Sequence, residues 1–120
     1  MNSQQSQYKA LVEALLPKDL FHYFEITEVK ITGKEIQVYL DELNNPPASH
    51  NNVKLTSKGF HSAVVIQDFP IRERAVFLHV RRRKWKEESS GKIISNSWNT
   101  VAEGTRYTKG FASFLKEVFG

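Results

Sequence analysis

The fold is decided by residues 74–86, which read RAVFLHVRRRKWK. Apolar side chains recur at every second position, at Val76, Leu78 and Val80, and this spacing predicts a β-strand. The next six residues, Arg81–Lys86, hold five cations and one indole. Because side chains alternate between the faces of a strand, we expect one long strand from residue 74 to 86. Its first half should be buried, and its second half should project as a basic, aromatic ribbon.

The basic ribbon predicts contact with nucleic acid. Its candidate phosphate ligands are Arg81, Arg82, Arg83, Lys84 and Lys86. Clustered cations release counterions when they neutralise phosphates, and a strand can follow a nucleic-acid backbone or enter a groove. The alternative is a charged guard on an exposed sheet edge. Three consecutive arginines repel one another, however, and so favour an anionic partner.

Trp85 has two interpretations of its own. Amid cations, its ring could stack on a base, and each stacked base contributes about 1–3 kcal/mol. Alternatively, it packs against Trp98 across a hairpin, since large aromatic residues dominate cross-strand pairing.

Outside this stretch, the pattern predicts three hairpins. Two apolar alternations flank Thr32-Gly33-Lys34, and a strand over 63–67 leads through a turn over 68–73 into the long strand. After the turn at Ser89-Ser90-Gly91, residues 92–98 could pair back onto the basic strand. Residues 44–52 predict an exposed loop.

Two terminal helices complete the predicted fold. The N-terminal helical stripe comprises Tyr8, Leu11, Val12, Leu15 and Leu16, and the C-terminal stripe comprises Phe111, Phe114, Leu115, Val118 and Phe119. Pro17 ends the first helix and can open a further turn over 17–21, and Thr105 or Thr108 can cap the last helix. We therefore expect an α+β fold, with an antiparallel sheet of two hairpins plus a basic hairpin, flanked by N- and C-terminal helices.

The composition is that of a globular chain with an uneven charge. The 120 residues, 40% of them hydrophobic and 25% charged, predict a single domain over 1–120, in which residues 1–7 are expected to be disordered. The net charge is +4. Residues 1–60 carry six lysines against seven acids, whereas residues 61–120 carry eleven basic residues against six acids. The positive field therefore belongs to the second half.

Several function classes are not expected. No run of eighteen apolar residues indicates a membrane span, and the first residues do not read as a secretory signal. The absence of cysteine excludes thiolate metal sites and fits a cytoplasmic protein. His22, His50, His61 and His79 lack metal-site spacing, and Asp41 and Glu42 are expected to point to opposite faces of a strand. We expect neither an enzyme nor a cofactor.

A second basic segment, residues 106–109 (RYTK), lies where the last helix is expected to begin. Arg106 and Lys109 beside a helix N-terminus are a candidate phosphate clamp, although capping with solvated charges explains the same residues.

Three segments resemble the N-terminal region of bacterial insertion-sequence transposases. They are QDFPIR at 67–72, LHVRRRKW at 78–85 and GTRYTKGF at 104–111, and the resemblance covers about residues 15–118. In that family a short domain precedes the DDE catalytic domain, sometimes on a separate reading frame. The order is similar to zinc-ribbon-type heads, in which an Asp-hydrophobic-Pro turn leads into a strand that ends in arginines.

The resemblance implies a metal-free head domain without catalytic acids, because this chain has no cysteine beside the basic strand. It implies recognition of double-stranded DNA at the element's ends through the basic hairpin and residues 106 and 109. The alternative is a protein-interaction module that docks a separately encoded catalytic transposase subunit through the C-terminal phenylalanine stripe. Single-stranded RNA binding through Trp85 is a further alternative, and a histidine-based ribonuclease using His61 or His79 is a remote one.

Overall fold

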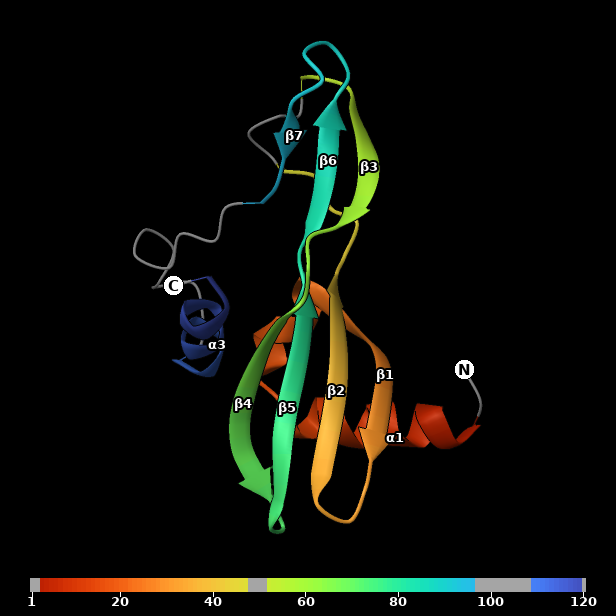
Figure 1. Cartoon of the computed structure of the whole chain (residues 1–120), viewed down its shortest axis with the longest axis vertical. Helices are drawn as coiled ribbons and strands as arrows, with labels where there is room; N and C mark the ends of the chain where they lie inside the picture. The colour runs from red at the N-terminus through yellow and green to blue at the C-terminus, as the bar shows by residue number, and fades with distance from the viewer. Residues whose placement is uncertain (1–2, 48–51, 97–108, 120) are drawn as a thin grey trace.

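The computed structural model describes residues 3–47, 52–96 and 109–119 (Figure 1). In chain order its elements are α1 (Ser3–Leu15), η1 (Lys18–His22), β1 (Phe24–Ile31), β2 (Glu35–Glu42), β3 (Leu55–Phe60), β4 (Val64–Ile71), β5 (Arg74–Arg81), β6 (Arg83–Glu87), β7 (Ile93–Ile94) and α3 (Lys109–Phe119). The molecule is elongated, with extents of 50 × 34 × 20 Å. The predicted α+β class with a helix near each end is confirmed.

The larger sheet has the strand order β1-β2-β5-β4. The hairpins β1–β2 and β4–β5 are antiparallel as expected. They join through β2 and β5, which run parallel in a continuous register from Glu35↔Ala75 to Asp41↔Arg81. The sheet is therefore largely antiparallel as expected, but its central pair is parallel, because the segment between β2 and β5 crosses over to bring the two hairpins side by side.

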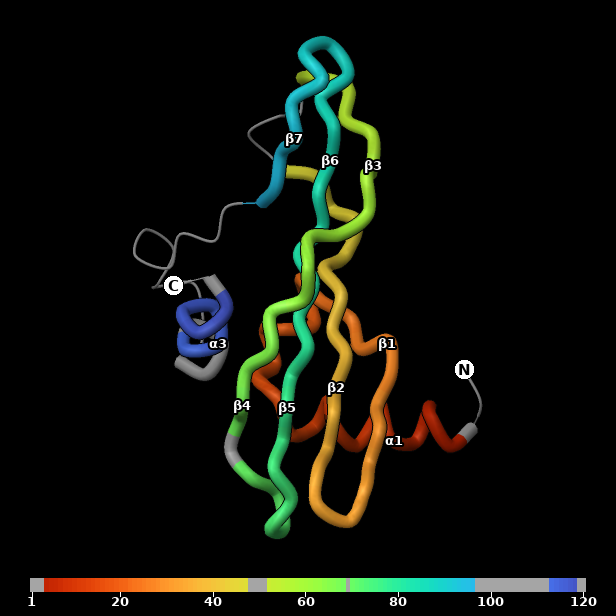
Figure 2. The backbone as a smooth tube through the Cα atoms, in the orientation of Figure 1, coloured from red at the N-terminus to blue at the C-terminus, as the bar shows by residue number. Residues whose placement is uncertain are grey.

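The predicted long strand is in fact two strands. β5 ends at Arg81, and β6 begins at Arg83 in a separate sheet of order β3-β6-β7. Figure 2 shows the chain passing continuously from the larger sheet into the smaller one at this point. β7 pairs with β6 as expected for the basic hairpin, whereas β3 was not predicted. Its burial does not alternate, and a register shift between Ser57 and Phe60 interrupts its pairing.

The turn between β4 and β5 is tighter than predicted. β4 continues to Ile71, so only Arg72 and Glu73 connect the strands, rather than the whole of residues 68–73. Both residues have positive φ, 50° and 70°, which is the backbone conformation of a two-residue hairpin turn that follows the twist of its strands.

The main core lies between one face of the larger sheet and the helices. Val76, Leu78 and Val80 are buried there, as their alternation predicted, and Phe114 and Leu115 of α3 pack into the same cluster. Thr105 and Thr108, the predicted caps of α3, lie outside the described residues. In the described part of the chain, no helix is long and apolar enough to cross a membrane.

The N-terminal helix differs from its prediction in two ways. It begins at Ser3, within the segment 1–7 for which disorder was expected. Gln5 explains part of this order, because its side chain exchanges hydrogen bonds with the backbone of Val29 in β1. Of the predicted stripe, Leu11 and Leu15 remain exposed, so the buried face of α1 is narrower than its sequence indicates.

Candidate nucleic-acid interface

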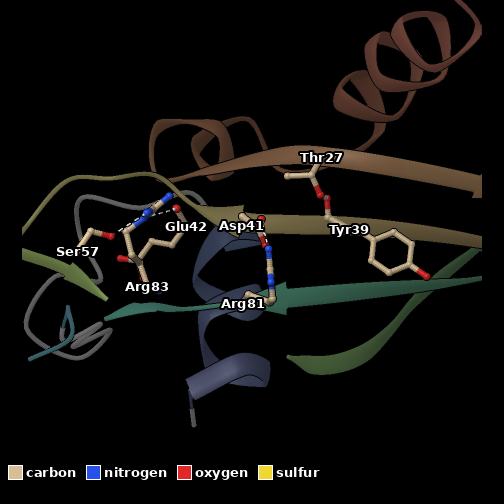
Figure 3. A network of polar contacts seen from close by, with 7 residues as sticks. All are labelled: Thr27, Tyr39, Asp41, Glu42, Ser57, Arg81 and Arg83. Carbon is tan, nitrogen blue, oxygen red and sulfur yellow. Dashed lines mark hydrogen bonds and ion pairs between the residues drawn. The ribbon is translucent and has the colours of Figure 1, made fainter. Parts of the chain in front are cut away.

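Arg81 is bound to a carboxylate of its own chain. Its Nε donates to Asp41 Oδ1 at 2.7 Å, and a terminal nitrogen donates to Oδ2 at 2.6 Å (Figure 3). The parallel register sets the two residues side by side at the ends of β2 and β5. Such a two-pronged pair is a strong, geometrically specific contact, and the hydrogen bond to Asp41 is the main cause that raises the pKa of Arg81.

Arg83 is held by the next residue of β2, Glu42. The Arg83 backbone N–H donates to Glu42 Oε1 at 2.8 Å, its Nε donates to the Glu42 carbonyl at 3.2 Å, and a terminal nitrogen donates to Ser57 Oγ at 3.3 Å (Figure 3). The Asn96 amide donates to the other carboxylate oxygen of Glu42 at 2.6 Å. Burial raises the pKa of Glu42, and the bonds from Arg83 and Asn96 lower it in part.

Phe60 and Asn96 complete this junction between the sheets. The guanidinium groups of Arg81 and Arg83 both lie over the Phe60 ring, at 4.1 and 4.6 Å from its centroid. Arg82 donates to the carbonyl of Asn96 at 3.2 Å. The anionic partner that three consecutive arginines suggested is thus present within the chain, as the two carboxylates at the end of β2. The sequence interpretation of Asp41 and Glu42 as unpromising missed this structural role.

Trp85 is packed inward. Only 1% of its surface is exposed, and its Nε1 donates to Asn44 Oδ1 at 3.1 Å. Its cross-strand neighbours are Ser57 on β3 and Ile94 on β7. The predicted partner Trp98 lies outside the described residues. A ring covered to this extent presents no face to a base, so the geometry favours packing over the predicted stacking role.

Lys84 and Lys86 are half-buried and lie on the other face of the small sheet. Trp85 occupies the buried face of β6, and because side chains alternate along a strand, its neighbours Lys84 and Lys86 lie on the opposite face. Lys86 lies opposite Thr56, whose hydroxyl donates to the carboxylate of Glu88. That bond is the main cause that lowers the pKa of Glu88, and the charges of Lys86, Lys54 and Lys58 lower it further. We call Lys54, Lys58, Lys84 and Lys86 the lysine face.

Sequence reasoning found only half of the lysine face. Lys84 and Lys86 belonged to the predicted ribbon, but Lys54 and Lys58 flank and occupy the unpredicted strand β3. The available signal was their spacing of four residues beside a threonine and a serine, which is too common to identify a strand. Pairing of β3 with β6 is what brings the two pairs of lysines together.

His61 lies beside the lysine face. Its Nε2 is 2.6 Å from Ser95 Oγ, and its backbone N–H donates to the Arg82 carbonyl at 2.8 Å. Burial lowers the pKa of His61, and the charges of Arg82 and Lys84 lower it further. An anion bound beside Lys84 would oppose those charges. Among the described residues, no group of three or more potential metal ligands comes together.

The second predicted basic site is not described. Arg106 lies outside the described residues, and Lys109 is the first residue of α3 with its side chain outside them. The phosphate clamp at these positions therefore stays a prediction.

Comparison with known proteins gives no relative from which a function could be carried over. No family model matches the chain, and neither a curated protein nor a solved structure matches it.

Proposed function

We propose that this protein is a non-catalytic DNA-binding module that holds the phosphate backbone on its lysine face. The observation that carries the proposal is that the arginines and the lysines of the basic stretch have different surroundings. The arginines are engaged by Asp41, Glu42 and Asn96, whereas Lys84 and Lys86 share with Lys54 and Lys58 the face of the small sheet opposite Trp85. Lysine is a compact, mobile charge suited to phosphates that vary in position.

The resemblance to transposase N-terminal regions supports double-stranded DNA at the ends of a mobile element as the target. The strand that carries Lys84 and Lys86 is part of that resemblance. A sheet that meets the duplex through lysines contacts phosphates, and such contacts position a protein without reading sequence. Sequence choice would come from other residues or from a catalytic partner.

The test is a titration of duplex DNA of about 20 base pairs at several salt concentrations, followed by fluorescence anisotropy. Lys84→Gln with Lys86→Gln, and Lys54→Gln with Lys58→Gln, should weaken binding to all duplex sequences. The slope of log K against log salt should flatten by about 0.9 for each lost phosphate contact.

The matched control is Lys18→Gln with Lys34→Gln, which removes the same charge from exposed positions on η1 and in the β1–β2 turn. In Figure 1 that turn lies at the opposite end of the molecule from the small sheet. If the lysine-face variants bind with the affinity and the slope of the control, the proposal is wrong.

A second candidate function is docking to a separately encoded catalytic subunit. Phe114 and Leu115 are buried, but Phe114 lines a groove of about 1040 Å³ between the end of α1, β4 and α3. Leu15, which is 53% exposed, and Ile66 are among its lining residues. Salt-insensitive DNA affinity, together with self-association of the isolated chain that Leu15→Gln abolishes, would favour this function over the first.

A further inference from the structure

The larger sheet has a second face, away from the helices. Ile36, Val38 and Leu40 of β2 face the core, as do Val76, Leu78 and Val80 of β5. The residues between them therefore point to the opposite side. In Figure 1, α1 passes behind the strands, so that this opposite side faces the viewer, and no described helix crosses it. We call it the open face, and the residues that matter on it are Lys30, Gln37, Tyr39, Gln67, Phe77, His79 and Arg81.

A row of side chains crosses the middle of the open face. The rings of Tyr39 and His79, which are neighbours in the parallel register, are stacked with centroids 4.4 Å apart and planes at 15°. Lys30 Nζ lies 5.3 Å from the centroid of the Tyr39 ring. His79 Nε2 is 2.5 Å from Gln37 Oε1, which fixes the imidazole on the sheet.

Phe77 extends this row along β5. It lies two residues before His79, which is about 6.6 Å along a strand. The register sets it between two amide side chains, Gln37 on β2 and Gln67 on β4. Phe77 is half-buried, although none of the core residues that the structure describes lies on its side of the sheet.

Arg81 continues the same line in the other direction. It lies two residues after His79, its side chain is 46% exposed, and its guanidinium covers the Phe60 ring. Asp41 compensates part of its charge, yet an Arg–carboxylate fork leaves other N–H groups able to donate. The line from Phe77 through His79 to Arg81 thus joins an aromatic surface to a cation on one strand.

We propose that the open face binds single-stranded nucleic acid, with bases against Phe77 and the Tyr39–His79 pair and with phosphates toward Lys30 and Arg81. A solvated sheet face is ordinarily polar, so three rings on one face call for a ligand. Aromatic side chains on an uncovered four-stranded sheet stack unpaired bases. The amides of Gln37 and Gln67 can donate to and accept from base edges. A duplex keeps its bases stacked inside and cannot use these rings.

This inference goes beyond the proposed duplex binding and rests on different residues. Its first test uses single-stranded RNA of about 12 nucleotides. Phe77→Thr and Tyr39→Thr introduce a β-branched residue, which suits a strand. Each should weaken single-strand binding by about five- to 150-fold, the loss of one stacked base. The salt slope should not change, since stacking is not screened, and duplex affinity should stay at the parent value.

Lys84→Gln with Lys86→Gln is the matched comparison, because it should weaken duplex binding and leave single-strand binding within about twofold of the parent. Open-face variants that retain the circular dichroism of the parent and bind single strands as tightly overturn the inference. The lysine-face proposal is tested separately, by the titrations with duplex DNA.

The second test uses the parent protein, so that it does not depend on the folding of any variant. Single-stranded RNA containing 5-bromouridine is photocrosslinked to the chain, and the attached peptides are identified by mass spectrometry. Crosslinks should map to Tyr39, Phe77 or His79. Crosslinks confined to β3 and β6 would assign single strands to the lysine face and overturn the inference.

Discussion

Replacing Trp85 with alanine should unfold the small sheet before the rest of the molecule. The buried residues of the larger sheet and the helices form one cluster, and Trp85 and Ile94 do not belong to it. They are the buried apolar residues of the small sheet, whose third strand, β7, has only two residues. The indole is therefore the principal apolar contact that holds β3, β6 and β7 together.

The magnitude follows from what the indole loses. Truncation of a buried tryptophan to alanine costs about 3–5 kcal/mol. Trp85→Phe keeps most of the apolar contact but removes the hydrogen bond to Asn44, which contributes about 0.5–1.5 kcal/mol. Asn44→Ala leaves the buried indole N–H without that acceptor and should cost about 1–3 kcal/mol. The order of the three effects is thus set by packing first and by hydrogen bonding second.

Hydrogen exchange monitored by mass spectrometry is the appropriate assay, because a small sheet can open while the larger one remains folded. Trp85→Ala should remove protection from β3 and β6 and leave β2 and β5 protected. Duplex binding should fall in parallel, since the lysine face depends on the same strands. If Trp85→Ala leaves the exchange of β3 and β6 unchanged but weakens binding, the ring acts on the ligand, and the packing explanation is refuted.

Three further predictions concern stability. Phe114→Ala should lower the free energy of unfolding in urea by about 3–5 kcal/mol, because the ring is buried edge-to-face on Phe24 at 5.7 Å; a near-neutral result would mark α3 as an exposed surface. Gly59→Ala should cost about 1–2 kcal/mol, since φ is 84° at the register shift of β3, and an unchanged melting temperature would contradict this. Because burial and neighbouring cations lower the pKa of His61 below 6.5, the unfolded chain takes up that proton first. The contribution of His61 to stability should therefore be lost as the pH falls below 6.5. The difference in stability between the parent and His61→Gln, measured from pH 8 to 5, isolates this contribution, and a pH-independent difference would be inconsistent with it.

The burial of β5 could be predicted from the sequence, but the residue at which this strand ends could not. The alternation of Val76, Leu78 and Val80 reports directly on which side chains leave water. From Arg81 to Lys86 every residue except Trp85 is a cation, so no periodicity marks the change of sheet at Arg82. That break depends on the parallel pairing of β2 with β5, a contact between residues about 40 positions apart in the chain.

The sequence pointed to the basic stretch as the candidate site, but it identified only some of the residues that now form that site. A cluster of cations predicts an anionic partner, but it does not indicate whether that partner is a bound ligand or a carboxylate of the same chain. Asp41 and Glu42 could be identified as the partners only after the strand order was known. The acceptor of the Trp85 indole, Asn44, likewise comes from a segment that reads as an exposed loop.

The arginines and the lysines in residues 81–86 have different roles, and a substitution that conserves the charge should distinguish these roles. A guanidinium is planar and weakly hydrated, so it can fork onto Asp41 and cover the Phe60 ring, whereas an ammonium group can do neither as well. Arg81→Lys keeps the net charge and therefore the long-range field, but it loses one of the two hydrogen bonds to Asp41 and the contact with the Phe60 ring.

Hydrogen bonds to charged groups contribute about 1.5–3 kcal/mol. Because Arg81 is partly exposed, the expected loss of stability in urea is about 1–2 kcal/mol. The salt slope of duplex binding should be that of the parent, because the lysine face is intact. A variant with unchanged stability and a flatter slope would instead make Arg81 a ligand of duplex phosphates, and the division between structural arginines and duplex-binding lysines would be wrong.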